Sequence, residues 1–401
     1  MKEQHYGPIE EHPLEFIVLA PNSWQGQWMN RQQLFSRIAA NHRVVYSCGP
    51  FFLWQRHEPQ FKSAHWLPKP KKLDGVILCA APIIYTRIPK IAALDNLATK
   101  KFCRYLENQT SHNAGICLYL FHPKFLDYTQ GIKHSLLVYH AYDDFSKQGL
   151  NQSKSKNEEI LLREADIVFA SSSKIKERLE KISGRKDIIF LPNGVDYEHF
   201  STPTAIPDEL AKLPGPKVAY TGSINKKVDL ELLLTIAEKL PDTQFIMIGP
   251  IGELDASGHL HLLQVKRTKN IHLLGEKQID EIPAYMQHVD INVMIYKSDE
   301  STWASSGYPL KLHEYLAVGK PIVSADIDAV REFASVLKIA KTPSQWVELL
   351  TQELQATPDE QSVGSRKKIS KSNTWNSRVD TILDKIQEKS LFDSSTIKVE
   401  K

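Results

Sequence analysis

The sequence predicts an α/β protein built from two doubly wound domains. The chain has 401 residues, whereas a typical domain has about 100–200. Hydrophobic residues make up 42% and charged residues 24%, which is enough apolar material for two cores. Short apolar runs rich in β-branched residues alternate with longer amphipathic patterns, and this alternation occurs in two series. Such a pattern is typical of parallel sheets covered by helices on both faces.

The first series occupies the first half of the chain. The runs read as buried strands because they are short, apolar and free of polar alternation. The predicted strands are Phe16–Ala20, Arg43–Cys48, Val76–Cys79, Ile116–Phe121, Ser135–His140, Asp166–Ala170 and Ile188–Leu191. The predicted helices, which carry apolar residues at helical spacing, are Met29–Asn41, Ile91–Leu106, Glu158–Ala165 and Lys174–Ile182.

The alternation stops at Tyr197–Pro216, a stretch whose prolines predict a linker. It then resumes as a second series. The predicted strands are Val218–Thr221, Gln244–Gly249, Ile271–Leu274, Asp290–Ile295 and Pro321–Ala325. The predicted helices are Asp229–Leu240, Ile279–Gln287, Leu310–Val318 and Pro343–Leu354.

A last amphipathic helix is predicted over Asn376–Lys389, with an apolar stripe formed by Val379, Ile382, Leu383 and Ile386. The predicted domains are 1–200 and 201–370, and we expect residues 371–390 to pack back on the first domain. Ligands of doubly wound sheets bind beyond the carboxyl ends of the strands, so with two such domains we expect the site in the cleft between them.

Composition excludes several classes of protein. Lys and Arg number 50 and Asp and Glu 47, a net charge of +3 that does not favour wholesale nucleic-acid binding. None of the four cysteines forms a C-x-x-C pair, which favours reduced thiols in the cytoplasm. The first residues contain no apolar segment typical of a secretory signal. No apolar run approaches the roughly 20 residues of a membrane-spanning helix, so we expect a cytoplasmic protein, at most peripheral to a membrane.

Nucleotide-binding signatures rich in glycine are missing. The first strand is not followed by G-x-G-x-x-G, and the chain has no phosphate-binding loop of the G-x-x-x-x-G-K-[ST] type. Phosphate can instead bind the free N–H groups at a helix N-terminus. The sequence Pro309-Leu310-Lys311 opens a predicted helix, and Glu314 follows one turn later, where a carboxylate can accept hydrogen bonds from a ribose diol. The alternative is a capped amphipathic helix with a solvated Lys and Glu.

The stretch Pro309–Ser324 (PLKLHEYLAVGKPIVS) resembles the donor-binding signature of GT-B glycosyltransferases, specifically the large family-4-like group. Further segments resemble the same group, in the same order: Ala165–Ser172, Leu191–Asp196, Val218–Ser223, Phe245–Pro250, Ile271–Gly275 and Pro283–Asp290. Trp24–Leu34 is similar to the opening loop and helix of bacterial envelope-polysaccharide transferases. The resemblance covers about residues 14–390 and implies a GT-B fold, in which two Rossmann-like domains face each other across a cleft.

The resemblance implies a set of donor-binding residues: Pro309, Leu310, Lys311, Glu314, Gly222, Lys226, Lys227, Gly249 and Ser306. Glu314 matches the family residue that binds the nucleotide ribose, and the backbone amides of Leu310 and Lys311 match those that hold the diphosphate. Lys226 or Lys227 would add positive charge, although not at the usual spacing. Gly249 lies where the family places the nucleobase. Ser306 replaces a Glu that contacts the donor sugar in retaining members.

The resemblance also implies residues on the acceptor side. His140, at the end of a strand, matches a family His or Asp that faces the donor sugar, and Asp143 is the second candidate for a catalytic group. Arg31, His122 and Asp144 are candidate acceptor-side contacts. The alternative interpretation is structural, with Asp143 or Asp144 capping a turn and His140 satisfied in the core.

The histidines show no metal-ligand spacing, so we expect no tightly bound cofactor; Mg²⁺ can accompany the nucleotide diphosphate without being required. Residues 54–72 contain five basic residues against one Glu, interleaved with aromatic residues. This composition favours peripheral contact with an anionic membrane surface or a lipid-diphosphate acceptor, and the alternative is an ordinary exposed loop.

The resulting hypothesis is a glycosyltransferase of the hexosyl type. It would move a sugar from a nucleotide diphosphate sugar to a cell-envelope or exopolysaccharide precursor, which is a glycan or is lipid-linked, with retention of configuration. One alternative is a sugar-nucleotide 2-epimerase on the same scaffold. The other is a non-catalytic module that binds sugar nucleotides or glycans, an interpretation favoured by Ser306.

Overall fold

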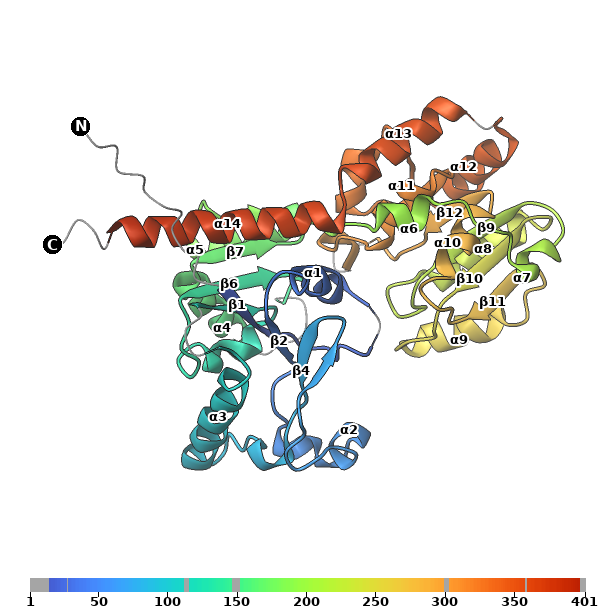
Figure 1. Ribbon diagram of the computed structural model, residues 1–401. Coiled ribbons are helices and arrows are strands. Elements are labelled where there is room, and N and C mark those ends of the chain that lie inside the picture. Colours follow the sequence, from blue (N-terminus) through green and yellow to red (C-terminus); the bar gives the residue numbers. More distant parts are fainter. Residues whose placement is uncertain are drawn as a thin grey trace, which may run out of the picture. The chain divides into compact units, whose positions relative to one another are not determined.

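The computed structural model describes residues 14–26, 28–111, 115–145, 152–298, 303–357 and 359–396. The chain forms two compact units (Figure 1). Unit 1 comprises the chain up to Ala170, Lys176–Phe190 and the residues from Val379, and unit 2 comprises Ser171–Ile175 and Leu191–Arg378. The division into domains at residues 200 and 370 stays a prediction, because units defined by contacts do not establish which segments fold on their own.

Unit 1 is built on an eight-stranded sheet with the order β3-β4-β2-β1-β5-β6-β7-β8. Only the edge strand β3 is antiparallel to its neighbour. The strands are β1 (Leu14–Leu19), β2 (Val44–Ser47), β3 (Lys71–Leu73), β4 (Val76–Cys79), β5 (Gly115–Leu120), β6 (Leu136–Ala141), β7 (Ile167–Ala170) and β8 (Ile189–Phe190). The apolar runs predicted as central strands form β1, β5 and β6, and these are almost entirely buried, as expected for a sheet covered on both faces.

Helices connect these strands. They are α1 (Asn30–Ile38), α2 (Pro59–Lys62), α3 (Ala92–Glu107), α4 (Gln152–Glu164) and α5 (Ser173–Ser183), with 3₁₀ turns η1 (Leu53–His57), η2 (Ile83–Tyr85) and η3 (Pro123–Tyr128). The final helix, α14 (Trp375–Thr396), contains the predicted apolar stripe. Within it Val379, Ile382 and Ile386 are buried and Leu383 is half-buried.

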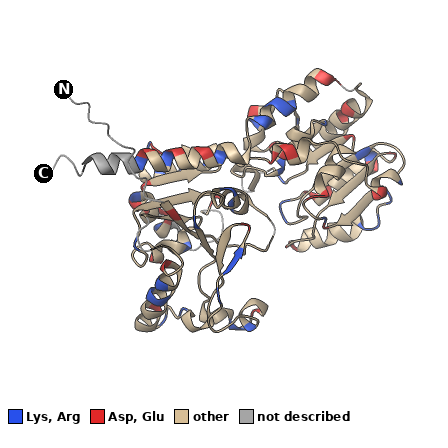
Figure 2. Cartoon of the chain, in the orientation of Figure 1, with Lys and Arg blue, Asp and Glu red and all other residues tan. Residues whose placement is uncertain are grey.

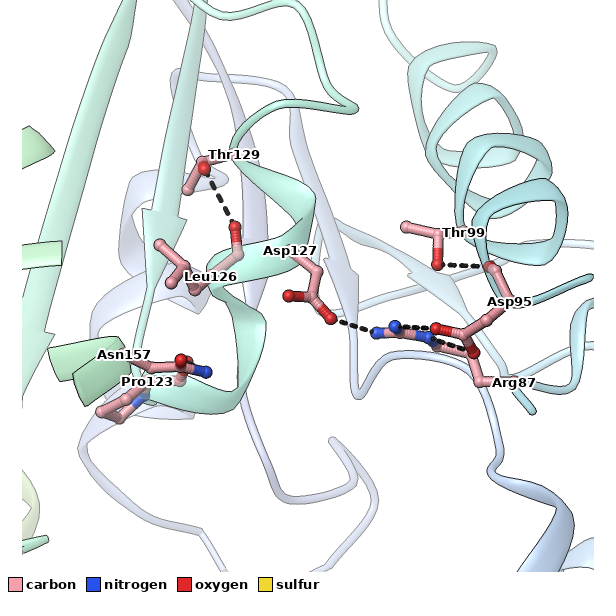
Figure 3. Close-up of polar contacts among 8 residues, drawn as sticks. All are labelled: Arg87, Asp95, Thr99, Pro123, Leu126, Asp127, Thr129 and Asn157. Carbon is pink, nitrogen blue, oxygen red and sulfur yellow. Dashed lines mark hydrogen bonds and ion pairs between the residues drawn. The ribbon is translucent and has the colours of Figure 1, made fainter. Parts of the chain in front are cut away.

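The buried charges of unit 1 include one fully paired arginine. Arg87 donates from Nε to Asp95 Oδ1 at 3.1 Å, and its Nη2 bonds Asp95 Oδ2 (Figure 3). Its Nη1 lies 2.7 Å from Asp127 Oδ2. Arg87 therefore ties the start of α3 to η3 with its charge fully compensated.

Unit 2 has a fully parallel six-stranded sheet with the order β11-β10-β9-β12-β13-β14. Its strands are β9 (Lys217–Thr221), β10 (Gln244–Ile248), β11 (Ile271–Gly275), β12 (Ile291–Met294), β13 (Ile322–Ala325) and β14 (Lys338–Ala340). Its helices are α6 (Tyr197–Ser201), α7 (Asp208–Ala211), α8 (Leu230–Lys239), α9 (Ala256–Val265), α10 (Ile282–Gln287), α11 (Lys311–Val318), α12 (Pro343–Gln355) and α13 (Glu360–Lys371), with 3₁₀ turns η4 (Trp303–Ser305) and η5 (Asp328–Phe333).

Several details differ from the sequence predictions. The stretch predicted as a linker contains α6 and α7 inside unit 2, where Phe200 and Leu210 are buried. Helices α9 and α13 were not predicted, because each contains a glycine (Gly258 or Gly364) and has a weak apolar stripe. None of the helices that the structure describes is long and apolar enough to cross a membrane.

Candidate functional site

Each unit carries its own group of candidate residues. In unit 2 they gather where β9 and β10 end and α11 begins. Tyr315 of α11 joins these elements, because its hydroxyl accepts a hydrogen bond from Thr221 N at the end of β9, over 2.9 Å. The same hydroxyl donates to the Val293 carbonyl of β12 at 3.3 Å. The N-terminus of α11 is thereby fixed against the carboxyl end of the sheet.

Two glycines leave the ends of β9 and β10 without side chains. Gly222 and Gly249 have φ values of 137° and 140°, which residues with a Cβ rarely adopt. A Cβ on Gly249 would lie 2.3 Å from the Gly222 carbonyl oxygen, and one on Gly222 would lie 2.8 Å from Lys311 Nζ. Both positions therefore require glycine, and the backbone can approach a ligand closely there.

Lys311 is a buried cation at the first turn of α11, with 7% of its surface exposed. Its Nζ lies 3.5 Å from the centroid of the Tyr220 ring and 5.0 Å from that of Tyr296. In the described part of the chain, no hydrogen bond or ion pair joins Lys311 Nζ to another residue. Burial lowers the pKa of Lys311 well below its ordinary value, and nearby Glu314 opposes this shift.

Glu314 lies one turn along α11 and is half-buried. Burial raises the pKa of its carboxyl to about 7, while Lys311 acts in the opposite direction. Burial thus disfavours the charged form of each group, while each group favours the charged form of the other. A ligand that brings polar groups into the site would replace part of the hydration that burial removes. It would therefore favour the charged forms of Lys311 and Glu314.

The remaining donor-side candidates have different positions. Leu310 is the N-cap of α11, and Pro309 precedes it rather than lying in the first turn as predicted. Ser306 is buried, and its carbonyl accepts a hydrogen bond from Ser172 Oγ at 2.6 Å. Lys226 Nζ lies 3.1 Å from Glu253 Oε2 in an exposed ion pair, and Lys227 Nζ lies 4.5 Å from the centroid of the Trp303 ring.

In unit 1, Arg31 and His140 lie against the same aromatic ring. The centroid of the Phe121 ring lies 5.0 Å from the centroid of the His140 ring and 5.9 Å from Arg31 Cζ. Arg31 also lies over the Tyr142 ring, at 4.5 Å. Burial lowers the pKa of His140 to about 3, with a smaller contribution from the charge of Arg31, so the imidazole is neutral near pH 7.

The other acceptor-side candidates are engaged in local structure. His122 Nδ1 accepts a hydrogen bond from Lys124 N at 3.0 Å and so caps η3. Asp143 Oδ1 accepts one from Asp144 N at 2.9 Å, and Asp144 Oδ1 lies 3.1 Å from Arg178 Nε. Each aspartate thus has a protein partner, and a role for either in the reaction stays a prediction.

The sequence did not indicate the aromatic rings against which Lys311 and Arg31 pack. Tyr220, Tyr296 and Tyr142 lie in or directly after predicted strands, where a tyrosine is ordinary. Their partners come from distant parts of the chain, so only the tertiary structure identifies them. Among the described residues, no group of three or more His, Cys, Asp or Glu side chains is arranged to hold a metal ion.

The fold of this chain is similar to that of several solved structures. Its structure is similar to that of an Escherichia coli trehalose-6-phosphate protein bound with UDP-2-fluoro glucose, with a TM-score of 0.69 at 10% identity and coverage of 92% of this chain and 98% of that one. It is also similar to Anabaena HepE in complex with UDP and glucose, with a TM-score of 0.65, 16% identity and coverage of 94% and 99%. The predicted α/β, GT-B fold is thereby confirmed.

The family comparison agrees with the fold. Residues 215–354, which lie in unit 2, match the family described as "Glycosyl transferases group 1". The chain is also 28% identical over 224 residues to the putative teichuronic acid biosynthesis glycosyltransferase TuaH of Bacillus subtilis (strain 168). That match covers 54% of this chain and 55% of the relative, so it spans about half the length of each. The chain thus has the GT-B fold, and within it residues 215–354 are similar to the group 1 glycosyl transferases.

Proposed function

We propose that the protein transfers a hexose from a UDP-sugar to a precursor of a bacterial envelope polysaccharide, with retention of configuration. UDP is proposed as the carrier because solved relatives of this fold are described with UDP or UDP-sugars. An envelope acceptor is proposed because the TuaH relative is named for teichuronic acid biosynthesis. The observation that carries the proposal is the pair of Lys311 and Glu314 beside Gly222 and Gly249.

That arrangement suits a nucleoside diphosphate. The glycines let a diphosphate approach the backbone, and the free N–H groups at the start of α11 favour an anion there. Lys311 would supply the cation, since a diphosphate would favour the charged form that burial disfavours. Glu314, one turn on, would accept hydrogen bonds from the ribose diol. The leaving diphosphate thus meets positive charge as the sugar–phosphate bond breaks, whether or not Mg²⁺ accompanies it.

We propose that unit 1 contributes the acceptor side. His140 would face the sugar substrates as a neutral hydrogen-bonding group, because its low pKa leaves it uncharged near pH 7. Asp143 would receive the proton of the acceptor hydroxyl. Asp144 would hold the strand end through Arg178, and His122 and Arg31 would contact the acceptor.

The test is turnover of a panel of UDP-sugars with and without an envelope lipid extract. We expect UDP release that depends on the acceptor, with the anomeric configuration of the product retained in NMR spectra. Glu314→Gln should abolish most of this activity. Glu231→Gln is the matched control, because Glu231 is an exposed first-turn glutamate of α8.

Three other outcomes would contradict the proposal. UDP release without acceptor, together with isomerisation of the sugar, would identify an epimerase. Binding without turnover would identify a binding module. An inverted product would overturn retention of configuration, as the replacement of the family's Glu by Ser306 would allow.

We further propose that unit 1 touches an anionic membrane surface. All five basic residues within 54–72 are exposed: Arg56, Lys62, Lys69, Lys71 and Lys72. Trp54 and Trp66 are 63% and 72% exposed. Leu94 and Leu97 of α3 are also exposed, and Figure 2 shows basic residues on β3 and along α3. Aromatic and basic side chains together favour an anionic interface.

Co-sedimentation with vesicles containing anionic lipid tests this contact. Replacing the five basic residues by Gln should release most of the bound protein. The matched control replaces Lys266, Arg267 and Lys269, which are exposed basic residues of unit 2. Equal release by both sets, or none by either, would contradict a contact through residues 54–72.

A further inference from the structure

Unpartnered buried nitrogen atoms are concentrated in one place in unit 1. Among the described residues of this unit, the buried side-chain nitrogens without a hydrogen-bond partner are Arg31 Nε, Arg31 Nη1, His140 Nε2 and Arg178 Nε. Arg178 Nε nevertheless lies 3.1 Å from the carboxylate of Asp144. The other three belong to Arg31 and His140, which share the Phe121 ring. Buried polar groups in proteins nearly always have partners, so this concentration calls for an explanation.

Arg31 is the second residue of α1 and is only 1% exposed. No ion pair joins it to a carboxylate within the described ranges. Arg31 Cζ lies 4.5 Å from the centroid of the Tyr142 ring, and the Tyr142 hydroxyl also interacts with the guanidinium, but Nε and Nη1 are left without a partner. Arg87 in the same unit is different, because carboxylates engage its Nε and both of its terminal nitrogens. An arginine keeps its charge in a protein, so Arg31 is a buried cation that lacks its anion.

His140 supplies a hydrogen-bond donor beside it. Its Nδ1 lies 2.9 Å from the hydroxyl of Tyr119, which is fully buried. No other acceptor for the proton of this hydroxyl is present in the described structure, so we assign the hydroxyl as the donor and Nδ1 as the acceptor. In a neutral imidazole the remaining proton is then on Nε2. All three unpartnered nitrogens therefore carry N–H groups.

We infer that Arg31 and His140 form an oxyanion site in unit 1, which binds a carboxylate or phosphate group carried by the acceptor saccharide. The planar donors of a guanidinium match the oxygens of such a group, and a desolvated site makes each charge-assisted hydrogen bond stronger. The identity of the ligand as acceptor rests on the proposed function. The site itself rests only on the contacts of unit 1.

The experiment measures stabilisation of the whole protein against heat by three probes: methyl β-glucuronide, methyl glucoside 6-phosphate and uncharged methyl glucoside. We expect one or both anionic probes at millimolar concentrations to raise the unfolding temperature and the neutral one to have no effect. Arg31→Gln should weaken the anion affinity by about tenfold or more. The matched control is Arg37→Gln on the same helix, whose guanidinium is already bonded to Gln33.

The two anionic probes distinguish a uronate from a phosphate, and saturating UDP distinguishes this site from the donor site. Anion effects that persist with UDP bound support a separate site. Effects that UDP abolishes, or that Arg31→Gln leaves unchanged, overturn the inference. Should Arg31→Gln fail to fold, competition with UDP on the unaltered protein decides. Acceptor-dependent turnover without any effect of the anionic probes would contradict the oxyanion site but not the proposed function. Binding of an anionic probe without turnover would contradict the proposed function but not the oxyanion site.

Discussion

Arg31 in unit 1 and Lys311 in unit 2 are both basic side chains buried without a carboxylate partner among the described residues, and they differ in how they carry their charge. Each is a buried cation in the first turn of a helix that begins near the carboxyl end of a parallel sheet, and each lies over a tyrosine ring. Neither has a carboxylate partner in an ion pair among the described residues. Lys311 can lose its proton when desolvated, as its lowered pKa indicates, whereas an arginine cannot.

The difference indicates how each site meets its ligand. In unit 2 burial disfavours the charged form of Lys311, and the proposed diphosphate would favour it. In unit 1 the charge of Arg31 is permanent, and its cost is offset only when an anion binds. Arg87 completes the comparison as a buried cation whose partners are part of the protein.

The largest expected effect concerns this paired cation. Arg87→Met leaves Asp95 buried and uncompensated, so we expect the free energy of unfolding to fall by about 3–5 kcal/mol. Urea denaturation measures this loss of unfolding free energy. Arg31→Met removes an uncompensated charge and should leave stability unchanged or higher. Equal losses in both variants would break the distinction between paired and unpaired cations.

The second effect tests Lys311 as the cation for the diphosphate. Lys311→Met should weaken UDP binding by about 2–4 kcal/mol, because a desolvated charge contact is lost. Calorimetric titration with UDP measures the change. Lys239→Met, at the exposed end of α8, is the control and should bind UDP normally. A normal affinity in Lys311→Met would show that the buried lysine serves the fold rather than the ligand.

The third effect separates ribose recognition from phosphate recognition. Glu314→Gln should weaken UDP binding by about 1–3 kcal/mol, because the ribose hydroxyls lose a charged acceptor. Pyrophosphate lacks a ribose, so its affinity should change much less. Both affinities can be measured by the same titration. A similar loss for the two ligands would remove the assignment of Glu314 to the ribose.

The smallest effect is a pH dependence of stability. The pKa of Glu314 rises from 4.5 to about 7 on folding, so between these values the unfolded chain ionises this carboxyl while the folded chain keeps it protonated. Its contribution to stability is present below pH 4.5 and is lost as the pH rises through about 7. Because the side chain is half-buried and Lys311 offsets part of the shift, we expect about 1 kcal/mol in total. Comparing urea unfolding of the wild type and Glu314→Gln at several pH values measures this loss, which should be missing from the variant.

Much of the fold could be predicted from sequence, because strands buried on both faces have a clear pattern, as in Phe16–Ala20. The candidate residues at element ends could also be predicted, since the motifs place Lys311 at the start of a helix and His140 at the end of a strand. Their chemical state could not. The burial of Lys311 between Tyr220 and Tyr296 arises from contacts between elements that are distant in sequence, and so does the missing partner of Arg31.

The contact between Gly222 and Gly249 has a consequence for how such chains change over generations. A side chain at position 249 would collide with the backbone carbonyl of position 222, and one at position 222 would meet Lys311 Nζ at a φ that favours glycine, so neither codon can change to another residue without strain. The two glycines meet in space although α8 and β10 lie between them in the sequence, so contiguous sequence signatures do not capture the pair. A search for distant relatives should therefore look for two single glycines, each directly after a neighbouring strand, rather than for a glycine-rich loop.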